Sequence, residues 1–305
     1  MVQCKRLPIL QICVIVLITS FAYSSSSSTN QNTPSYYRSI NDLDQYGSSP
    51  QINNARLAST LHGTLTIAVL SIPSNSIQVV SLQKKIPGVI TSLKRGRVNI
   101  IAQERGENIN AVIGSGLQSD ITFVVSLLRK HVSECWERYD SIPSLDRVTM
   151  DATEVMLCFM GYEVNEEIRD GTRGILNDSS NGEDETISIG RPLACNLLFL
   201  EVGKNSKLDM KLVDPGGIIS ESLIGRAIGQ GYERANTLLR NRWRVDHTAK
   251  DLEELCPDII RETVMEEGLL SDREMEHAFI VCEELTKEGL TIRRIPFLAQ
   301  KVEDK

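Results

Sequence analysis

Residues 190–217 read GRPLACNLLFLEVGKNSKLDMKLVDPGG, with two apolar runs on either side of a short polar segment. Runs of this length, joined by a segment that favours a turn, are typical of a β-hairpin. The second run ends in Asp214-Pro215-Gly216-Gly217, where proline and glycine favour a sharp turn. The stretch therefore predicts two antiparallel strands followed by a tight turn.

Further strand pairs are predicted on both sides of this hairpin. Residues 64–70 and 76–82 are rich in β-branched side chains, and Pro73-Ser74-Asn75 separates them. The remaining strand-like runs occupy residues 98–102, 110–114, 277–282 and 290–295. Strands are thus expected at the beginning, in the middle and at the end of the folded part.

Four segments have the apolar spacing of helices. They are residues 118–139, 146–160, 220–244 and 248–267. Asp146 is the expected N-cap of the second helix and Thr248 that of the fourth. Gly268 is expected to end the fourth helix.

Gly225 and Gly229 lie four residues apart, which places them on one face of the helix expected at 220–244. Small residues at these positions would let the helix approach a sheet closely. A glycine-rich phosphate loop is the competing interpretation, but no Gly-Lys-Ser/Thr follows. We therefore expect a packing role.

The order of elements is strands, two helices, strands, two helices and strands. Both faces of such a layer of strands must be buried, and two packed sheets with helices outside bury them most simply. The sequence predicts an α+β fold, arranged as a four-layer α-β-β-α sandwich.

The N-terminus has the pattern of a signal peptide over residues 1–24. Lys5 and Arg6 precede an apolar run, and small residues follow it. The run is short for a membrane span, so no stable span is expected if the segment is cleaved. A signal anchor, or a wrongly assigned start of a cytosolic protein, are the alternatives.

The rest of the chain divides by composition. Residues 25–35 are expected to be a disordered linker. The domain is expected at 36–296, with a polar, acidic loop insertion at 162–189 and a C-terminal tail at 297–305. The insertion holds the glycosylation sequon at Asn177.

Composition excludes several classes of function. A net charge of −7 argues against nucleic-acid binding, and the cluster Lys94-Arg95-Gly96-Arg97 is expected to be a solvated turn. Seven cysteines without a CxxC pair predict neither a disulfide framework nor a zinc site. The four histidines are scattered, so no metal or other cofactor is expected.

Several short motifs occur in the order found in one known family. Arg191-Pro192 precedes the run CNLLFLEV, Asp214-Pro215-Gly216-Gly217 ends the hairpin, and Ser115-Gly116-Leu117 with Ser119-Asp120 opens the helix at 118–139. In these motifs the chain resembles the α-type, non-catalytic subunits of the proteasome core particle, which have the N-terminal-nucleophile hydrolase fold. The resemblance covers most of residues 37–295. The residues that carry it are Gly47, Gln51, Ala55, Gly63, Gly116, Asp120, Arg191, Pro192, Asp214, Pro215 and Gly217.

Gly63-Thr64 raises a second possibility, because catalytic proteasome subunits use a threonine freed by cleavage after a glycine, with its own amine as the base. The resemblance then requires an aspartate and a lysine at the positions of Val80 and Gly96. Neither is present, and Lys94 has no carboxylate partner in the sequence nearby. We therefore expect Thr64 to be an ordinary strand residue and the chain to have no catalytic residue.

The resemblance implies a subunit that assembles with other proteasome-type subunits into a heteromeric ring. Such rings gate substrate entry and serve protein catabolism, including ubiquitin-dependent proteolysis, in the cytoplasm and nucleus. A regulatory particle is a further possible partner, although Ile101 stands where the activator pocket normally has a lysine. The alternatives are a threonine hydrolase that uses Thr64, and a secreted or organellar binding module.

Overall fold

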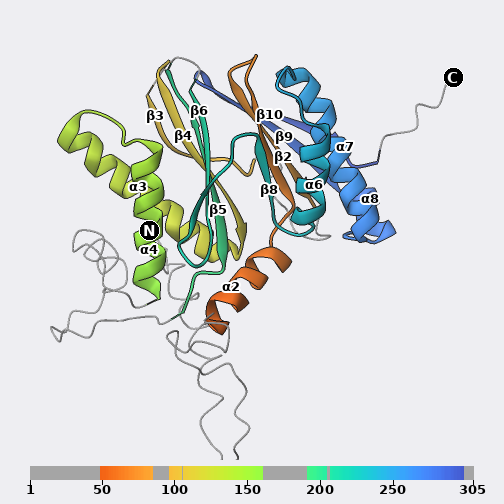
Figure 1. The fold of residues 1–305 in the computed structure, drawn as a ribbon, viewed down its shortest axis with the longest axis horizontal. Helices are drawn as coiled ribbons and strands as arrows, with labels where there is room; N and C mark the ends of the chain where they lie inside the picture. Colours follow the sequence, from red (N-terminus) through yellow and green to blue (C-terminus); the bar gives the residue numbers. More distant parts are fainter. Residues whose placement is uncertain (1–48, 85–95, 105, 161–190, 205–206, 299–305) are drawn as a thin grey trace, which may run out of the picture. The chain divides into compact units, whose positions relative to one another are not determined.

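The computed structural model describes residues 49–84, 96–104, 106–160, 191–204 and 207–298. These residues all lie in one compact unit, residues 38–305. The described part contains two five-stranded antiparallel sheets and six helices, which confirms an α+β fold (Figure 1).

One sheet has the strand order β10-β9-β2-β1-β8. Its strands are β1 (Thr66–Ser71), β2 (Ser76–Gln83), β8 (Gly225–Ile228), β9 (Phe279–Thr286) and β10 (Gly289–Pro296). The other sheet has the order β3-β4-β5-β6-β7. Its strands are β3 (Asn99–Glu104), β4 (Asn108–Gly116), β5 (Cys195–Val202), β6 (Leu208–Val213) and β7 (Ile219–Glu221).

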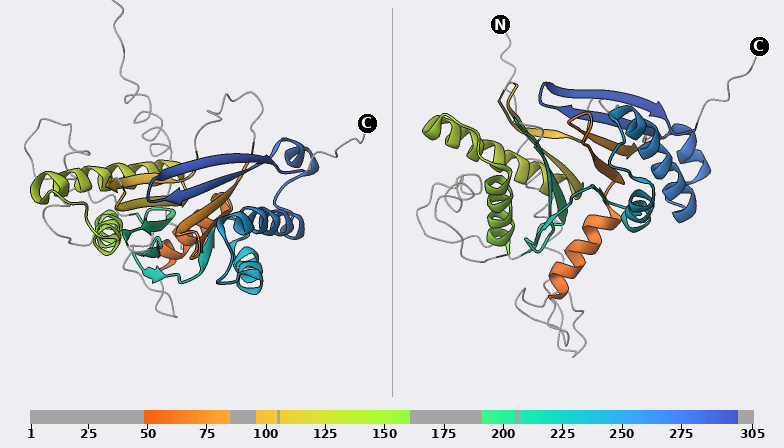
Figure 2. Two further views of the ribbon diagram at one scale, coloured as in Figure 1. Left: turned by 90° about the horizontal axis from the view of Figure 1, so that it is seen from above. Right: turned by 45° about the horizontal axis from the view of Figure 1, so that its top comes forward.

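The helices lie on separate sides of this pair of sheets (Figures 1 and 2). They are α2 (Pro50–Leu61), α3 (Gln118–Tyr139), α4 (Leu145–Phe159), α6 (Tyr232–Arg242), α7 (Ala249–Glu267) and α8 (Asp272–His277). Helices α3 and α4 contact strands of the β3–β7 sheet, whereas α6 and α7 contact strands of the other sheet. Helix α2 contacts β4 and β5 near one end of the sheets (Figure 1).

Strand β5 explains why the stretch at 190–217 determines so much of the fold. Leu197 and Phe199 belong to an apolar cluster with α3 and α4, whereas Leu198 and Leu200 belong to a cluster with residues of the other sheet. Both faces of β5 are therefore buried, and a strand buried on both faces has a continuous rather than alternating apolar sequence. A third cluster joins the remaining face of the β1-containing sheet to α6 and α7.

Most of the expected elements are present. The helix at Gln118–Tyr139 has the expected bounds, and Thr248 caps α7 in a capping box while Gly268 ends it in a left-handed conformation. The N-cap of α4 is Ser144 and not Asp146, because the Ser144 side chain accepts the Arg147 N–H. The charged segment after Ser271 forms the short exposed helix α8.

The helix expected at 220–244 is wrong in its first part. Residues 219–228 supply β7 and β8, and α6 begins only at Tyr232. Gly229 and Gly231 have φ of 91° and 77°, which interrupts any helix before α6. Gly225 and Gly229 do allow their segment to approach another backbone closely, as expected. They do so as a strand residue paired with β1 and as a turn residue beside Thr64, and not on a helix.

Other expectations fall on residues outside the described part. These are the signal-like segment, the linker, Gly47, Lys94 and the insertion with Asn177. The core extends one residue past the expected end of the domain, because Phe297 is buried against α7 and β9 residues. Within the described residues, no helix is long and apolar enough to cross a membrane.

Candidate functional site

Two of the motif glycines, Gly63 and Gly116, lie against Ser59, near the C-terminal end of α2. Ser59 is fully buried, and its Oγ accepts a hydrogen bond from Asn196 Nδ2 of β5 at 2.9 Å. Its carbonyl accepts a bond from Ser115 Oγ of β4 at 3.2 Å. Helix α2 is thus joined by side-chain hydrogen bonds to two neighbouring strands, and we call these contacts the Ser59 junction.

Two of the predicted glycines are required at this junction. A Cβ on Gly63 would lie 1.9 Å from Ser115 Oγ and 2.4 Å from Ser59 O. Gly116 has a φ of 124°, and a Cβ there would lie 2.2 Å from Ala194 O and 3.0 Å from Ser59 Cα. Only glycine fits at either position, so these residues fix how closely α2 approaches the strands.

Gln51 and Ala55 lie one helical turn apart on α2, as their spacing predicted. Ala55 is buried and Gln51 is half-buried. Arg56 follows Ala55 in the helix, and its Nη2 lies 2.7 Å from Asp214 Oδ2. The helix is therefore also tied to the turn that ends the opening hairpin.

That turn is built by the Asp214 carboxylate. Asp214 Oδ1 accepts the N–H groups of Gly216 at 2.9 Å and Ile218 at 2.8 Å. Gly217 has a φ of 76°, and its N–H binds the Asp214 carbonyl. Pro215 is buried between them. The motif thus turns the chain from β6 into β7 and presents Asp214 to Arg56.

Asp120 and Arg191 form the other predicted contact between distant motifs. The two Nη groups of Arg191 each donate a hydrogen bond of 2.9 Å to one carboxylate oxygen of Asp120. Asp120 Oδ2 also accepts the Ala194 N–H at 3.0 Å. Burial alone would raise the pKa of Asp120, but the hydrogen bonds from Arg191 and Ala194 outweigh it and hold the pKa below its usual range. Pro192 is buried and follows Arg191 at the entry to β5.

Thr64 lies between α2 and β1 and is half-buried. Its Oγ1 accepts a hydrogen bond from Arg97 Nη2 at 2.9 Å. Both backbone polar groups of the preceding residue, Gly63, are hydrogen-bonded. Its N–H donates to Thr60 O, and its carbonyl accepts the Gln230 N–H at 3.0 Å. The Gly63–Thr64 peptide is therefore part of the folded backbone.

Arg97 is fixed in turn by Glu283 of β9. The buried Glu283 carboxylate accepts the N–H of Arg97 at 2.7 Å and that of Val98 at 3.2 Å. Burial raises the pKa of Glu283, although these N–H groups and the Arg97 charge oppose the rise. Burial lowers the pKa of Arg97, with the Glu283 charge opposing. The expectation of a solvated turn is wrong for Arg97.

The two positions that hold an aspartate and a lysine in catalytic subunits are Val80 and Gly96 here, and neither residue has an ionisable side chain. Val80 belongs to the apolar cluster with α6 and α7. Gly96 lies against the Glu283 carboxylate, where a Cβ would be 1.8 Å from Oε1. Ile101, at the position of the pocket lysine, is buried in the cluster with α3 and α4.

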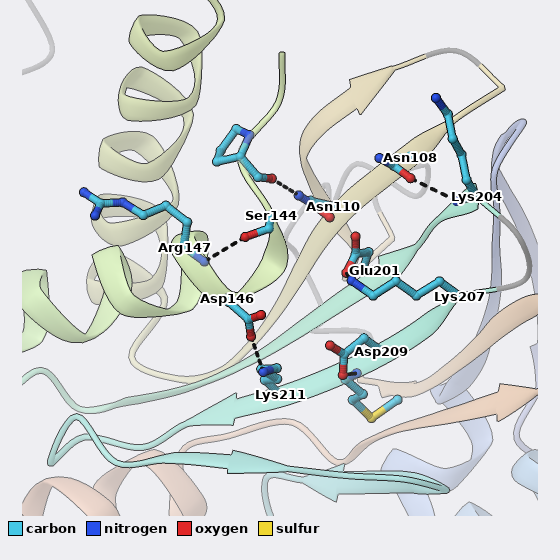
Figure 3. Close-up of polar contacts among 12 residues, drawn as sticks. Asn108, Asn110, Ser144, Asp146, Arg147, Glu201, Lys204, Lys207, Asp209 and Lys211 are labelled. Carbon is cyan, nitrogen blue, oxygen red and sulfur yellow. Dashed lines mark hydrogen bonds and ion pairs between the residues drawn. The ribbon is translucent and has the colours of Figure 1, made fainter. Parts of the chain in front are cut away.

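A network of charges lies on β5 and β6 beside α4 (Figure 3). Lys211 forms ion pairs with Asp146 and, at 3.0 Å, with Glu221. Lys207 Nζ lies 2.7 Å from Glu201 Oε2. Each of these lysines has a carboxylate partner, so the network joins α4 to β6 and β7 rather than offering a free charge for a ligand.

The acidic, histidine and cysteine side chains of the described part form no metal-binding cluster. No group of three or more His, Cys, Asp or Glu side chains there converges in a way that could hold a metal ion. Cys195 and Cys256 are buried thiols whose pKa is strongly raised by burial. Burial raises the pKa of the Cys282 thiol to about 11. These thiols are protonated at neutral pH and are poor nucleophiles.

Three functional positions were missed from the sequence. Glu283 had a signal in the sequence, because it directly follows the apolar run of a predicted strand. A carboxylate is rarely buried in such a position unless it has a partner. Ser59 and Asn196 have no such signal. Their roles depend on a contact between residues 137 positions apart.

The chain was compared with protein families and with curated proteins. Residues 180–280, about a third of the chain, match the family model described as proteasome subunit. No curated protein matches the chain. The matched segment runs from before Arg191 to the second residue of β9 and includes the opening hairpin and the Asp214 turn. This match supports the proteasome family for the chain.

Proposed function

We propose that the chain is a non-catalytic, α-type proteasome-like subunit. Its role is to form a ring with other proteasome-type subunits and to contribute to substrate gating of a protein-degrading particle. The observation that carries this proposal is the Ser59 junction. Its buried hydrogen bonds tie α2 to the sheet, which supports α2 as a retained part of the domain rather than a removable leader.

The permanence of α2 matters because a threonine nucleophile requires a free N-terminus at Thr64. Cleavage after Gly63 would remove α2, and with it Ser59 and Arg56. The hydrogen bonds from Asn196 and Ser115, and the ion pair with Asp214, would all be lost. Buried polar groups without partners cost about 1–3 kcal/mol each, so the folded domain opposes this processing.

The surroundings of Thr64 favour the same proposal. Arginine is a donor only and stays protonated in proteins, so Arg97 cannot remove a proton from Thr64 Oγ1. The carboxylate next to Arg97 is Glu283, which is bound to backbone N–H groups. The catalytic subunits use the free amine of the threonine itself as the base, and the folded Gly63–Thr64 peptide offers no such amine.

The fold that we propose is the four-layer α-β-β-α sandwich of the N-terminal-nucleophile hydrolase type. The three apolar clusters support it, since they join α3 and α4 to one sheet, one sheet to the other, and the second sheet to α6 and α7. The family match at 180–280 supports it independently of the helix packing.

The decisive experiment is purification of the full-length chain, tagged at its C-terminus, from the cells that produce it. Mass spectrometry would define its N-terminus and the proteins that copurify. We expect an N-terminus before Pro50, and a particle far larger than the 34.0 kDa chain that contains other proteasome-type subunits.

The other outcomes point to the alternatives. A mature N-terminus at Thr64 would overturn the proposal in favour of a threonine hydrolase. A monomer in the secretory or organellar fraction would instead indicate a binding module with a used signal segment. Recovery in the cytoplasm or nucleus within the large particle agrees with the proposed role, and a copurifying regulatory particle would identify a further partner.

A further inference from the structure

Helices α3 and α4 are joined by an ionisable pair that has no part in the proposed function. His131 Nδ1 of α3 lies 2.8 Å from Asp151 Oδ2 of α4. The Asp151 side chain is 3% exposed, whereas that of His131 is 23% exposed. The carboxylate is thus held away from water while the imidazole can still exchange its proton with solvent.

We propose that His131 and Asp151 form a proton-dependent clamp, which tightens the pairing of α3 and α4 at mildly acidic pH and relaxes it as the pH rises. The proposal uses neither Thr64 nor α2, so it stands or falls independently of the proteasome assignment. Histidine suits this task, because its charge changes within the range of pH that cells and their compartments cover.

The charges around the pair come from both helices. Arg147 of α4 lies 2.9 Å from Asp151 Oδ1, but its Nε is not aligned for a hydrogen bond. Glu134, Cys135 and Arg138 lie on α3 and Glu154 on α4. Arg147 disfavours the imidazolium, whereas Glu134 favours it. The hydrogen bond with Asp151 is the largest influence, and it raises the pKa of His131 against the opposing effect of burial.

Glu154 acts in the same direction as His131. Burial, and then the Asp151 charge, raise the pKa of Glu154. Its Oε2 is buried and makes no hydrogen bond within the described residues. Protonation of Glu154 therefore relieves repulsion with Asp151, and protonation of His131 adds an attractive charge. Only the change at His131 acts between the two helices, because Asp151 and Glu154 lie together on α4.

The sign of the effect follows from linkage. A histidine with a raised folded pKa contributes stability that is fully present below its unfolded value, about 6.5. This contribution is lost as the pH rises through the folded value. The two helices should therefore be held more firmly near pH 6 than near pH 8. The apolar cluster beneath them keeps them attached throughout.

Two measurements on the full-length chain test the clamp. The first is a titration of the histidine side chains by NMR, in wild type and in Asp151→Asn. We expect His131 to titrate above the value of histidine in an unstructured peptide, and to lose that upward shift in Asp151→Asn. A His131 that titrates at or below the peptide value in wild type overturns the proposal, whatever the variants do.

The second measurement is amide hydrogen exchange of α3 and α4 at pH 6 and pH 8. The rates are expressed as protection factors, which correct for the effect of pH on exchange in an unfolded chain. Wild type should lose protection in these helices at pH 8, and His131→Gln should show no such difference. His277→Gln, at the exposed end of α8, is the matched control and should behave as wild type. An unchanged pH dependence in His131→Gln would contradict the clamp.

Discussion

Asn196 of β5 donates a hydrogen bond from Nδ2 to the Oγ of Ser59 on α2, at 2.9 Å and across 137 positions of sequence. Ser59 Oγ in turn donates to the carbonyl of Arg56 at 2.8 Å. A single buried hydroxyl therefore satisfies a strand donor and a helix acceptor at once. This contact holds α2 against the sheet that contains the opening hairpin.

Ser59→Ala should lower the free energy of unfolding by about 1–3 kcal/mol, because it leaves the Asn196 side chain without its acceptor. Ser133→Ala is the matched control. Ser133 is an exposed serine of α3 that makes the same kind of bond to the carbonyl one turn before it. Its loss should cost within about 0.5 kcal/mol. Urea unfolding of both variants checks the difference, and equal costs would contradict the role of Ser59.

Gly63→Ala should destabilise the domain by about 1–3 kcal/mol or more, since the added Cβ meets a backbone carbonyl that cannot move freely. Gly268→Ala makes a useful comparison. A Cβ there meets nothing within 4 Å, and its cost comes only from the φ of 60°, about 1–2 kcal/mol. Thermal unfolding of both variants at one pH compares their stabilities. A Gly268 variant that is less stable than the Gly63 variant would refute the close contact at α2.

Arg191→Met should cost about 1–3 kcal/mol at neutral pH, because the buried Asp120 loses its main partner while solvent partly screens the half-exposed Arg191. The cost should shrink on acidification. The pKa of Asp120 is held low in the folded wild type, so its stabilising effect is present above the unfolded value, about 3.9, and lost as the pH falls through the folded value.

Unfolding by urea at pH 7 and at a pH below about 3.9 measures this change. Arg293→Met, which breaks an exposed pair with Glu253 at 3.2 Å, is the control. It should cost less than about 1 kcal/mol, with little dependence on pH. A cost for Arg191→Met that stays constant down to the lowest usable pH would show that the Asp120 charge is not what Arg191 stabilises.

Thr64→Val should cost about 1–3 kcal/mol, because it removes the acceptor of the Arg97 guanidinium and adds no useful polar contact. Thr237→Val, on the exposed face of α6, should be nearly neutral. Under the proposed function, neither variant changes the peptidase activity of a particle that contains the chain. Loss of activity in Thr64→Val alone, with its stability unaltered, would favour the threonine hydrolase.

Local patterns in the sequence were enough to predict many elements of the fold. The 22-residue helix at Gln118–Tyr139, the cap at Thr248 and the hairpin of β5 and β6 depend on side-chain periodicity and on turn residues close to each other in the chain. The segment at 220–228 was misread because Gly225 has no side chain to reveal that it pairs with Val69 as a strand.

The sequence by itself determined the α+β class, the apolar run that forms β5 and the motifs Arg191-Pro192 and Asp214-Pro215-Gly216-Gly217. These are properties of neighbouring residues. The tertiary structure alone decided that Ser59 joins α2 to β4 and β5, and that Arg97 lies between Thr64 and Glu283. Such contacts form between residues tens to more than a hundred positions apart, so their partners are fixed only when the sheets pack together.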